Sequence, residues 1–453
     1  MKRKKPAVRR VKRRAARPAA VSPSGFRAGF QAGYQEGLRS GSESYGTRFN
    51  GTSIIIPSYN QVHYLRQCID SINRYTGPAY EIIVVDNASK DGTADYLRRA
   101  GGKVRYRILE TNRGFSGAVN VGLMMAKGTT MLVLNNDTVV TARWLDNLLL
   151  CLSSDPAIGM VGPVTNYISG DQQIQVPYTK IEDMQAFAAK HNVSDSSKWK
   201  RIDRLAGVCL LFRRELWEQT GYFDEGFALG NFEDDDYNIR VRLQGRSLVI
   251  AGDTFIHHYG SISIRALGSH LAEVNQRNQQ FYQEKWGNPH SLVHMVKEMI
   301  RLPGGVESIG QPPALSETSF FPEGIAVKGT TNTAYWIESG TRRPIAGEAN
   351  IPVVRISQTD MRRWPVAETI AAEEAHARWH GGTGNMGDGY MVTGPDNIHY
   401  VLEKGTRRRI ASRNALERWG LQHKPQVPLT AEQIGMLPEG LPVIAPAIVG
   451  ERL

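Results

Sequence analysis

Short apolar runs alternate with helical patterns from residue 52 onward, and this alternation limits the folds open to the chain. Runs such as "SIIIP" (Ser53–Pro57), "EIIVV" (Glu81–Val85) and "TMLVL" (Thr130–Leu134) are continuous and rich in β-branched residues. Such runs are typical of strands that are buried on both faces. Between them, apolar residues recur at helical spacing, as in residues 65–72. This order of elements indicates an α/β domain with a mostly parallel sheet and helices on both faces.

A different pattern begins near residue 301. The segment "GTTNTAYWIESGTRRPIA" (Gly329–Ala346) recurs as "GPDNIHYVLEKGTRRRIA" (Gly394–Ala411), 65 residues later. In each copy, aromatic and aliphatic residues precede a glycine, Gly340 or Gly405, at which we expect a β-hairpin to turn. The repeat therefore predicts a small, duplicated module of β-hairpins that is separate from the α/β part.

A second similarity within this module links "FPEG" (Phe321–Gly324) with "LPEG" (Leu437–Gly440). Two roles for the module stay open. It is a structural appendage or oligomer contact, or it is a recognition module in which Tyr335, Trp336, Tyr400 and the paired arginines contact a partner molecule.

The formal net charge of +11 belongs to the N-terminal end of the chain. Residues 1–35 contain eleven Lys and Arg and no acidic residue, so residues 36–453 are about neutral. This balance argues against nucleic acid as the main partner. Because no apolar run follows the basic residues, they do not form a signal peptide. We expect a disordered basic tail, with contact to anionic membrane lipids as the alternative.

Five glycines from Gly25 to Gly41 recur at every fourth position after the basic tail. They give a poor isolated helix, so we expect a linker or, with a partner, a contact between copies of the chain. We therefore predict three parts: a basic tail and glycine-rich linker over 1–48, the α/β domain over 49–300, and the duplicated hairpin-repeat module over 301–453.

The chain has three cysteines, Cys68, Cys151 and Cys209, which follow no disulfide or zinc pattern. They fit a reducing compartment. No stretch approaches the roughly 18 apolar residues of a membrane-spanning helix. We expect a cytoplasmic protein that can lie at the inner face of the membrane.

Acidic residues follow two of the predicted strands. Asp86 comes directly after the second buried run, and Asp137 lies just past "TMLVL". Ligands of open α/β sheets bind at these carboxyl ends, although an Asp after a strand is also a common turn former. A third acidic group, Glu233–Asp236, allows three interpretations: a solvated helix N-terminus, a metal site, or a catalytic base with supporting carboxylates.

Seven motifs occur in one order over roughly residues 50–290. They are "SIIIPSYNQ" (53–61), "VVDNASKDGT" (84–93), "NRGFSGAVNVGL" (112–123), "LVLNNDT" (132–138), "GVCLLFRRELWEQTGYFDEGF" (207–227), "FEDDDYNIRVRLQG" (232–245) and "HHYGSIS" (257–263). In this order the sequence resembles the inverting glycosyltransferases of family 2, which have the GT-A fold. Within that family it is most similar to rhamnosyltransferase-like members. The resemblance implies a nucleotide-sugar donor, and it favours a helix for "NIRVRL", whose alternation alone would also fit a strand.

The resemblance also implies a divalent cation, Mn²⁺ or Mg²⁺, on the donor diphosphate. The family's "DxD" motif corresponds to Asn135-Asn136-Asp137, which leaves Asp137 as the charged ligand and Asn136 as a neighbouring donor contact. His258 corresponds to the histidine that completes the metal site in relatives, and His257 is the alternative. An imidazole ligand suits Mn²⁺ at least as well as Mg²⁺.

For the nucleotide, Asp86 corresponds to an aspartate that accepts a hydrogen bond from the ring N–H of a pyrimidine base. Such a base is the uracil or thymine of a UDP- or dTDP-sugar. We expect Ser58, and Asn112 or Arg113, to line the same pocket.

Glu233 and Asp234 correspond to the acidic pair on the acceptor side of the family's pocket. Asp234 is the predicted general base, which takes the proton from the acceptor hydroxyl. Asp236 corresponds to an acid that caps or orients, and Asp235 to a variable position that solvent can reach.

The sequence thus predicts a hexosyltransferase-type enzyme that transfers a sugar to a glycan, lipid-linked or protein acceptor, with a homo-oligomer as a further expectation. Two other functions stay open. One is a GT-A-shaped binding protein without catalysis, which the Asn135-Asn136 pair allows. The other is a cell-surface polymer adaptor that uses the basic tail and the arginine-rich hairpins.

Overall fold

The computed structural model describes residues 46–100, 102, 104–260, 270–301, 315–381, 387–451 and 453. The basic tail and the glycine repeat lie outside these residues. Contacts divide the chain into two units, residues 1–48 and residues 49–453. The predicted boundary near residue 300 stays a prediction.

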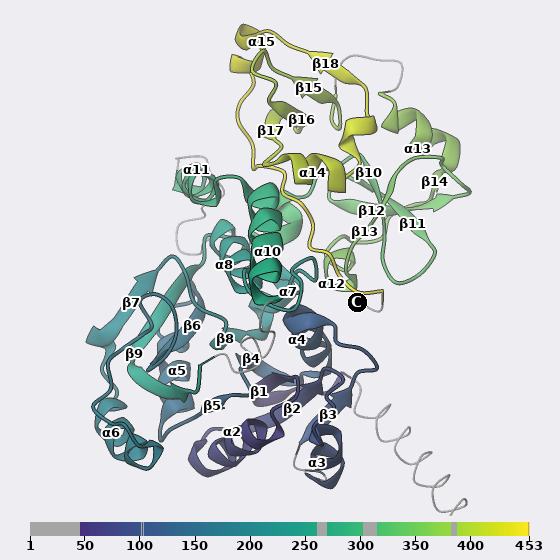
Figure 1. The fold of residues 1–453 in the computed structure, drawn as a ribbon. Coiled ribbons are helices and arrows are strands. Elements are labelled where there is room, and N and C mark those ends of the chain that lie inside the picture. The colour runs from purple at the N-terminus through teal and green to yellow at the C-terminus, as the bar shows by residue number, and fades with distance from the viewer. Residues whose placement is uncertain are drawn as a thin grey trace, which may run out of the picture. The chain divides into compact units, whose positions relative to one another are not determined.

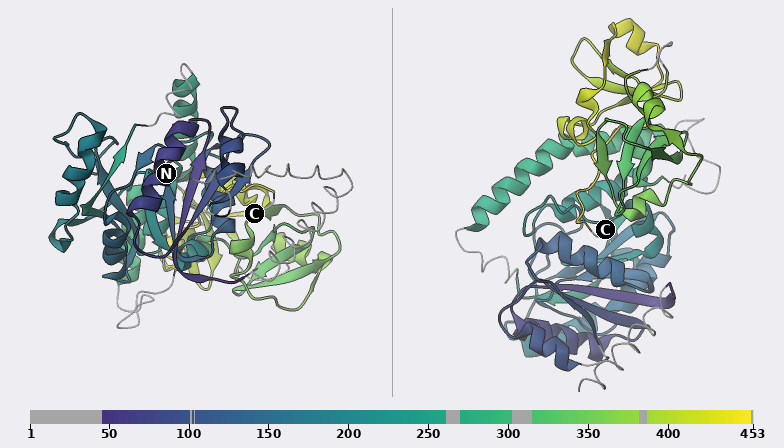
Figure 2. Two further views of the ribbon diagram at one scale, coloured as in Figure 1. Left: turned by 90° about the horizontal axis from the view of Figure 1, so that it is seen from below. Right: turned by 90° about the vertical axis from the view of Figure 1, so that its right-hand side faces the viewer.

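Nine of the described strands form one sheet, and helices cover both of its faces (Figure 1; Figure 2). The strands, in sheet order, are β3 (Arg105–Ile108), β2 (Tyr80–Asp86), β1 (Phe49–Ser58), β4 (Gly128–Leu134), β8 (Cys209–Arg213), β6 (Ile158–Thr165), β9 (Ser247–His258) and β5 (Thr138–Val139), with β7 (Trp199–Ile202) also pairing to β9. The helices are α2 (Val62–Tyr75), α3 (Thr93–Ala100), α4 (Gly114–Met125), α5 (Trp144–Ser153), α6 (Met184–His191), α7 (Arg214–Thr220), α8 (Glu233–Leu243), α10 (His270–Trp286) and α11 (Pro289–Arg301).

The predicted α/β class is confirmed. Strands β3, β2, β1, β4, β6 and β9 run in one direction, and β8, β5 and β7 run in the other. Alternate residues of a strand point to opposite faces, so β1 contributes to two cores. Ile54 and Ile56 pack with α2, α3 and α5, whereas Ile55 packs with α4, α7 and α8. The segment "NIRVRL" lies in helix α8, as the resemblance implied.

Parallel pairing brings the predicted strand-end residues together. Ser58, the last residue of β1, is in register with Asp86, the last residue of β2. Strand β4 lies on the other side of β1 and leads into Asn135–Asp137 and then β5. Strand β5 in turn pairs Thr138 with His258 at the end of β9. One edge of the sheet therefore holds the ends of four strands.

The C-terminal part contains two smaller sheets with the same pairing pattern (Figure 1). The first has the strands β10 (Ile325–Lys328), β11 (Ala334–Glu338), β12 (Thr341–Ala346), β13 (Val353–Arg355) and β14 (Ile370–Ala371); the second has β15 (Met391–Thr393), β16 (His399–Glu403), β17 (Thr406–Arg409) and β18 (Gln426–Pro428). The helices of this part are α12 (Gln358–Met361), α13 (Ala372–Trp379), α14 (Arg413–Arg418) and α15 (Ala431–Gly435). In each sheet the first strand pairs antiparallel with the second and parallel with a later strand, which is β13 in the first sheet and β18 in the second. The duplicated hairpins are therefore present.

Each predicted hairpin turns at its glycine. Gly340 and Gly405 have φ values of 69° and 73°, and the residues before them, Ser339 and Lys404, also have positive φ. Two successive residues with positive φ form the type I′ turn that suits a two-residue hairpin. The carboxylate of Glu323 accepts the backbone N–H groups of Ser339 and Gly340, which fixes the first turn.

One hydrophobic core joins the C-terminal sheets to helices α8, α10 and α11. Trp336 is 2% exposed within this core, and Tyr400 is also buried, so these two aromatic residues are not available to stack on a sugar. None of the described helices combines the length and the apolar character needed to cross a bilayer.

Candidate functional site

A cavity of about 940 Å³ opens where β1, β4 and β9 end and where α8 begins. Its volume is in the range of small-molecule sites. The predicted site residues that line it are Ser58, Asn112, Asn136, Asp137, Glu233, Asp234 and His258. Residues expected to serve the donor and residues expected to serve the acceptor therefore share one cavity.

On the donor side, the strand ends hold amide and hydroxyl groups close together. The Asn136 side chain donates to Ser58 Oγ at 3.3 Å, and both residues are buried. The Asn112 side chain accepts the N–H of Gly114, where α4 begins. These short polar side chains leave room in the cavity while their positions are fixed by the backbone.

Asp137 and His258, the two predicted metal ligands, lie next to each other. Asp137 Oδ1 lies 3.3 Å from His258 Nε2, and both side chains are almost fully buried. His258 Nδ1 is 2.7 Å from the carbonyl oxygen of Tyr167, which can only accept, so Nδ1 carries a proton. A histidine that donates to a carbonyl in this way presents its other nitrogen as a ligand.

The donor set fits a partial cation site. Within the described residues, no group of three or more His, Cys, Asp or Glu side chains is arranged to hold a metal. Mg²⁺ in nucleotide sites is commonly held by one or two protein groups together with substrate phosphates. Asp137 and His258 match that smaller set.

His257 does not take part in this pair. It is not among the cavity residues, and its Nδ1 lies 2.8 Å from the hydroxyl of Tyr178. Consecutive residues of β9 point to opposite faces of the sheet, which separates His257 from His258. Burial, then the neighbouring His258, lowers the pKa of His257 to about 4. The structure therefore favours His258 over His257 as the candidate ligand.

Asp86 is fully buried beside Ser58, but it is not among the residues that line the cavity. Its Oδ1 accepts the N–H of Ser89 at 3.1 Å. Its Oδ2 is buried and has no hydrogen-bond partner among the described residues. A buried carboxylate oxygen without a partner is costly, so Asp86 retains an unused acceptor next to the cavity wall.

Arg113 lies outside the cavity lining, unlike its neighbour Asn112. Its guanidinium pairs with Glu225 at 2.8 Å, and its backbone N–H donates to the side chain of Asn87. Of the two alternatives predicted for this position, Asn112 is the residue that lines the cavity.

On the acceptor side, Asp234 is held by backbone groups. Its Oδ2 accepts the N–H of Gly207 at 2.8 Å, and its Oδ1 accepts the N–H of Asp235 at 2.9 Å. A Cβ at position 207 would lie 3.3 Å from the Asp234 Cβ, so glycine allows this close approach. Two amide donors orient the carboxylate while its edge still lines the cavity.

Arg204 is the cation beside these carboxylates, and the sequence analysis did not identify it. Its Nη2 lies 3.8 Å from Asp234, and its Nε donates to Asp235 at 2.5 Å. Asp235 is therefore paired and is not simply solvated as expected. Burial, then the charge of Asp234, raises the pKa of Asp235 to about 6 despite Arg204. An isolated arginine three residues before Gly207 belongs to no motif, so no local pattern would have revealed it.

Glu233 lines the cavity next to Asp234. Its Oε2 is buried without a hydrogen-bond partner in the described part of the chain. Burial, then the charge of Asp234, raises the pKa of Glu233 well above its ordinary value.

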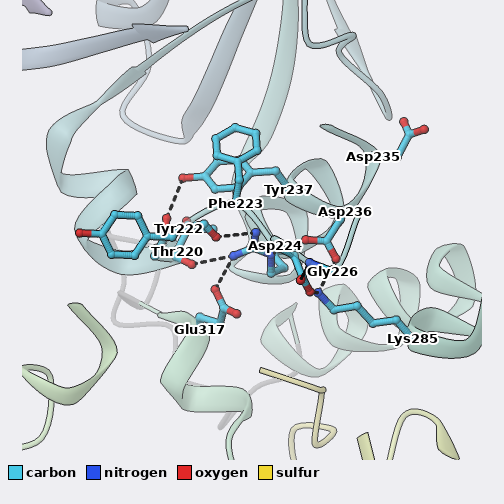
Figure 3. Close-up of polar contacts among 12 residues, drawn as sticks. Thr220, Tyr222, Phe223, Asp224, Gly226, Asp235, Asp236, Tyr237, Lys285 and Glu317 are labelled. Carbon is cyan, nitrogen blue, oxygen red and sulfur yellow. Dashed lines mark hydrogen bonds and ion pairs between the residues drawn. The ribbon is translucent and has the colours of Figure 1, made fainter. Parts of the chain in front are cut away.

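Asp236 is not among the residues that line the cavity, and its side chain lies toward Lys285 (Figure 3). It contacts Lys285 Nζ at 2.5 Å, Arg240 Nε at 2.9 Å and the indole N–H of Trp286 at 2.9 Å. Lys285 also pairs with Asp224, and Arg240 also pairs with Glu317. We call these five charged residues, Asp224, Asp236, Arg240, Lys285 and Glu317, the buried ionic network. The predicted orienting role of Asp236 fits this position.

A loop with unusual backbone angles closes the cavity before α8. Leu229, Asn231 and Phe232 have positive φ values, which are uncommon for residues other than glycine. The buried side chain of Asn278 donates to the carbonyls of Ala228, Gly230 and Asn231, so α10 holds the loop in this conformation.

Residues 53–221 match the family described as Glycosyl transferase family 2. The chain contains a family 2 glycosyltransferase domain. The matched residues include Ser58, Asp137 and Gly207 on the strand ends of the cavity. The family 2 match ends before Asp234 and His258, so the roles of these two residues depend on the motif resemblance and on their position in the cavity.

Curated relatives of the family 2 domain are glycosyltransferases. AglE of Haloferax volcanii is 25% identical over 219 residues, which cover 46% of this chain and 66% of that protein. GlyG of Streptococcus pneumoniae is 29% identical over 208 residues, covering 44% and 68%. The uncharacterized glycosyltransferase RP339 of Rickettsia prowazekii is 31% identical over 176 residues, covering 38% and 53%. The chain spans about half to two thirds of the length of these relatives.

Solved structures show a weaker likeness. GalNAc-T7 with UDP, GalNAc and Mn²⁺ has a TM-score of 0.41 and 17% identity, over 56% of this chain and 52% of that chain. The mannosyltransferase PcManGT from Pyrobaculum calidifontis with GDP-Man and Mn²⁺ has a TM-score of 0.37 and 23% identity, over 58% and 67%.

Proposed function

We propose that this protein is an inverting glycosyltransferase that moves a sugar from a UDP- or dTDP-sugar to an acceptor hydroxyl. The observation that carries the proposal is that Asp137 and Asp234 line one cavity next to a family 2 domain. The two carboxylates have different surroundings. Asp137 faces a histidine nitrogen, and Asp234 faces backbone amides and an arginine. This difference suits Asp137 for the donor side and Asp234 for the acceptor side.

On the donor side, Asp137 and His258 would hold Mn²⁺ or Mg²⁺ together with the donor diphosphate. When bound, the cation supplies a Lewis acid that stabilises the negative charge of the leaving diphosphate. Ser58, Asn112 and Asn136 would contact the nucleotide or its phosphates. Asp86 would accept the ring N–H of a uracil or thymine base through its partnerless Oδ2, and this contact requires a shift of the cavity wall, because Asp86 is fully buried and does not line the cavity.

On the acceptor side, Asp234 would accept the proton of the acceptor hydroxyl. The oxygen then forms a bond to the anomeric carbon from the face opposite the diphosphate, and the bond from that carbon to the diphosphate oxygen breaks. One displacement inverts the configuration. Glu233 lines the same cavity with a buried Oε2 that has no hydrogen-bond partner among the described residues, so it would contact the substrate beside Asp234.

The family match does not specify the sugar, the acceptor or the place of action. We propose a hexosyltransferase of the rhamnosyltransferase-like kind, an acceptor on a glycan, lipid or protein, and action at the cytoplasmic face of the membrane. The basic tail would provide peripheral contact with anionic lipid there. The donor screen below addresses the sugar and the nucleotide.

A thermal-shift screen of nucleotide sugars with and without Mn²⁺ tests the donor side. We expect a UDP- or dTDP-sugar to raise the melting temperature only with Mn²⁺, because a ligand that binds the native state stabilises it. In Asp137→Ala this metal-dependent shift should fall by at least half. Equal shifts with and without Mn²⁺, in both proteins, would contradict the proposed role of Asp137.

A further inference from the structure

A second cavity, of about 710 Å³, lies beside the first. Ser169 and Arg204 line both cavities, so the two spaces adjoin at these residues. Neither the family match nor the sequence motifs assign a role to this second cavity, which lies on the acceptor side of Asp234.

The lining of the second cavity is strongly basic. Its basic side chains are Lys200, Arg201, Arg204, Arg242, Arg246 and Lys297, and its acidic side chains are Asp171 and Asp203. The basic residues come from β7, from the loop before β8, from α8 and the turn after it, and from α11. Because separate elements converge on one space, the fold itself concentrates the positive charge. A cleft lined mainly by one sign of charge attracts ions of the opposite sign.

Four of the six basic side chains already face an acid, in the pairs Lys200–Asp171, Arg201–Asp155, Arg204–Asp235 and Arg242–Asp203, at 2.5–2.7 Å. In each pair the acid keeps between 21% and 65% of its side chain exposed, so solvent weakens the pairing. Lys200 pairs with Asp171 at 2.7 Å, but both side chains are more than half exposed. Exposed pairs of this kind contribute about 0–1 kcal/mol, so a stronger anion can replace the acid. The Arg246 guanidinium donates to the neutral carbonyl oxygen of Pro156 and forms no ion pair within the described part of the chain.

Arg204 connects this charge to the reaction centre. Its guanidinium lies 3.8 Å from Asp234 and 2.5 Å from Asp235 while it also lines the second cavity. An acceptor whose hydroxyl reaches Asp234 would therefore extend past Arg204 into the basic space. Arginine forks bind phosphate oxygens in a bidentate manner, and four of the six cations are arginines.

We propose that the second cavity binds phosphate groups of the acceptor, so that the acceptor is a phosphate-bearing glycan or glycan carrier. The inference rests on the proposed function and specifies its acceptor. The phosphate can be the pyrophosphate of a lipid-linked sugar or the phosphodiester of a polymer. Both present the same oxyanions to the cavity.

Calorimetric titration of the full chain with inorganic pyrophosphate and with glycerol phosphate oligomers tests this assignment. EDTA is present, so that a cation-dependent donor site does not contribute. We expect the double variant Lys200→Gln/Arg246→Gln to bind at least 10-fold more weakly than the parent protein. The variant Arg98→Gln/Arg99→Gln removes the same charge from α3, away from the cavity, and should stay within 2-fold.

Each outcome decides the proposal. Tighter binding of pyrophosphate supports a lipid-linked acceptor, and tighter binding of the oligomers supports a phosphodiester polymer. Absence of binding by the parent protein, equal loss in both variants, or binding of a uronic acid oligosaccharide in place of both probes would overturn it. The Mn²⁺-dependent donor shift is measured separately, so a failure of the acceptor inference is distinguishable from a failure of the proposed function.

Discussion

On the cavity side of α8, the pKa of Asp235 is raised to about 6, whereas on the opposite side the pKa of Asp236 is lowered. Both carboxyl groups are largely buried, and burial by itself raises the pKa of each. For Asp236 the nearby Lys285 and Arg240 outweigh burial. Among the described residues, Asp235 has one cation within reach, Arg204, and this cation also faces Asp234. The number of cations within reach, more than burial, therefore decides the charge state along this turn.

The positive and negative charges of the buried ionic network nearly cancel, whereas the charges on the cavity side of α8 do not. It contains two cations and three carboxyl groups. Burial raises the pKa of Glu317 to about 8, against the opposing effect of Arg240, so this carboxyl holds its proton at neutral pH. Two carboxylates then face two cations. A balanced network can anchor α8, while its cavity side keeps charges for the substrate.

The largest expected effect is on the cavity side, in Asp234→Asn. If Asp234 is the base, sugar transfer should fall by about 10²- to 10⁴-fold, because an amide cannot take the acceptor proton. Donor affinity should stay within a few-fold, as measured by titration with the nucleotide sugar. Asp235→Asn is the matched control, and its rate should fall by less than 10-fold. If Asp234→Asn instead loses donor binding, Asp234 belongs to the metal site.

On the opposite side, Asp236→Ala should destabilise the fold. Removing this carboxylate leaves Arg240 and Lys285 with one fewer counter-charge in a buried environment, which costs about 3–5 kcal/mol. Unfolding in urea measures the change in the free energy of unfolding. Asp235→Ala, which removes a partly exposed carboxyl, should change it by about 1 kcal/mol or less. Equal losses in the two variants would show that α8 is not anchored by the network.

The strand ends of the cavity could be predicted from the sequence, and most of the cations around α8 could not. Ser58 and Asp137 follow apolar runs, and the parallel pairing that such runs favour brings them to one edge. Like-charge repulsion within Glu233–Asp236 is equally visible in the sequence. Of the compensating cations, only Arg240 is suggested by the sequence, because it lies four residues after Asp236 on the same helix. Arg204 and Lys285 come from other segments that only tertiary packing brings to α8.

The C-terminal repeat could likewise be predicted only in part from the sequence. The 65-residue offset predicted both hairpins, because each turn depends on its own local residues. The "FPEG" and "LPEG" similarity does not mark equivalent positions. Gly324 donates to the carbonyl of Ile337 inside the first repeat, whereas Pro438 accepts from Arg407 in the second. In the first repeat the carbonyl of Pro365 accepts the N–H of Arg342, so Pro365 is the counterpart of Pro438. Short motifs alone do not establish tertiary equivalence.

The smallest expected effect is the pH dependence of stability, which should have opposite signs for the two neighbours. Asp235 has an ordinary pKa of 3.8 and a folded pKa of about 6, so its contribution to stability is lost as the pH rises from about 4 to 6. With its partial exposure and Arg204 beside it, we expect roughly 1–2 kcal/mol. The lowered pKa of Asp236 gives a contribution that is present above pH 3.8 and is lost at lower pH. The free energy of unfolding in urea is measured between pH 3 and 7. The loss of stability between about pH 4 and 6 should be absent from Asp235→Asn, and the loss below pH 3.8 should be absent from Asp236→Asn. Profiles parallel to the parent protein in both variants would contradict the assigned charge states.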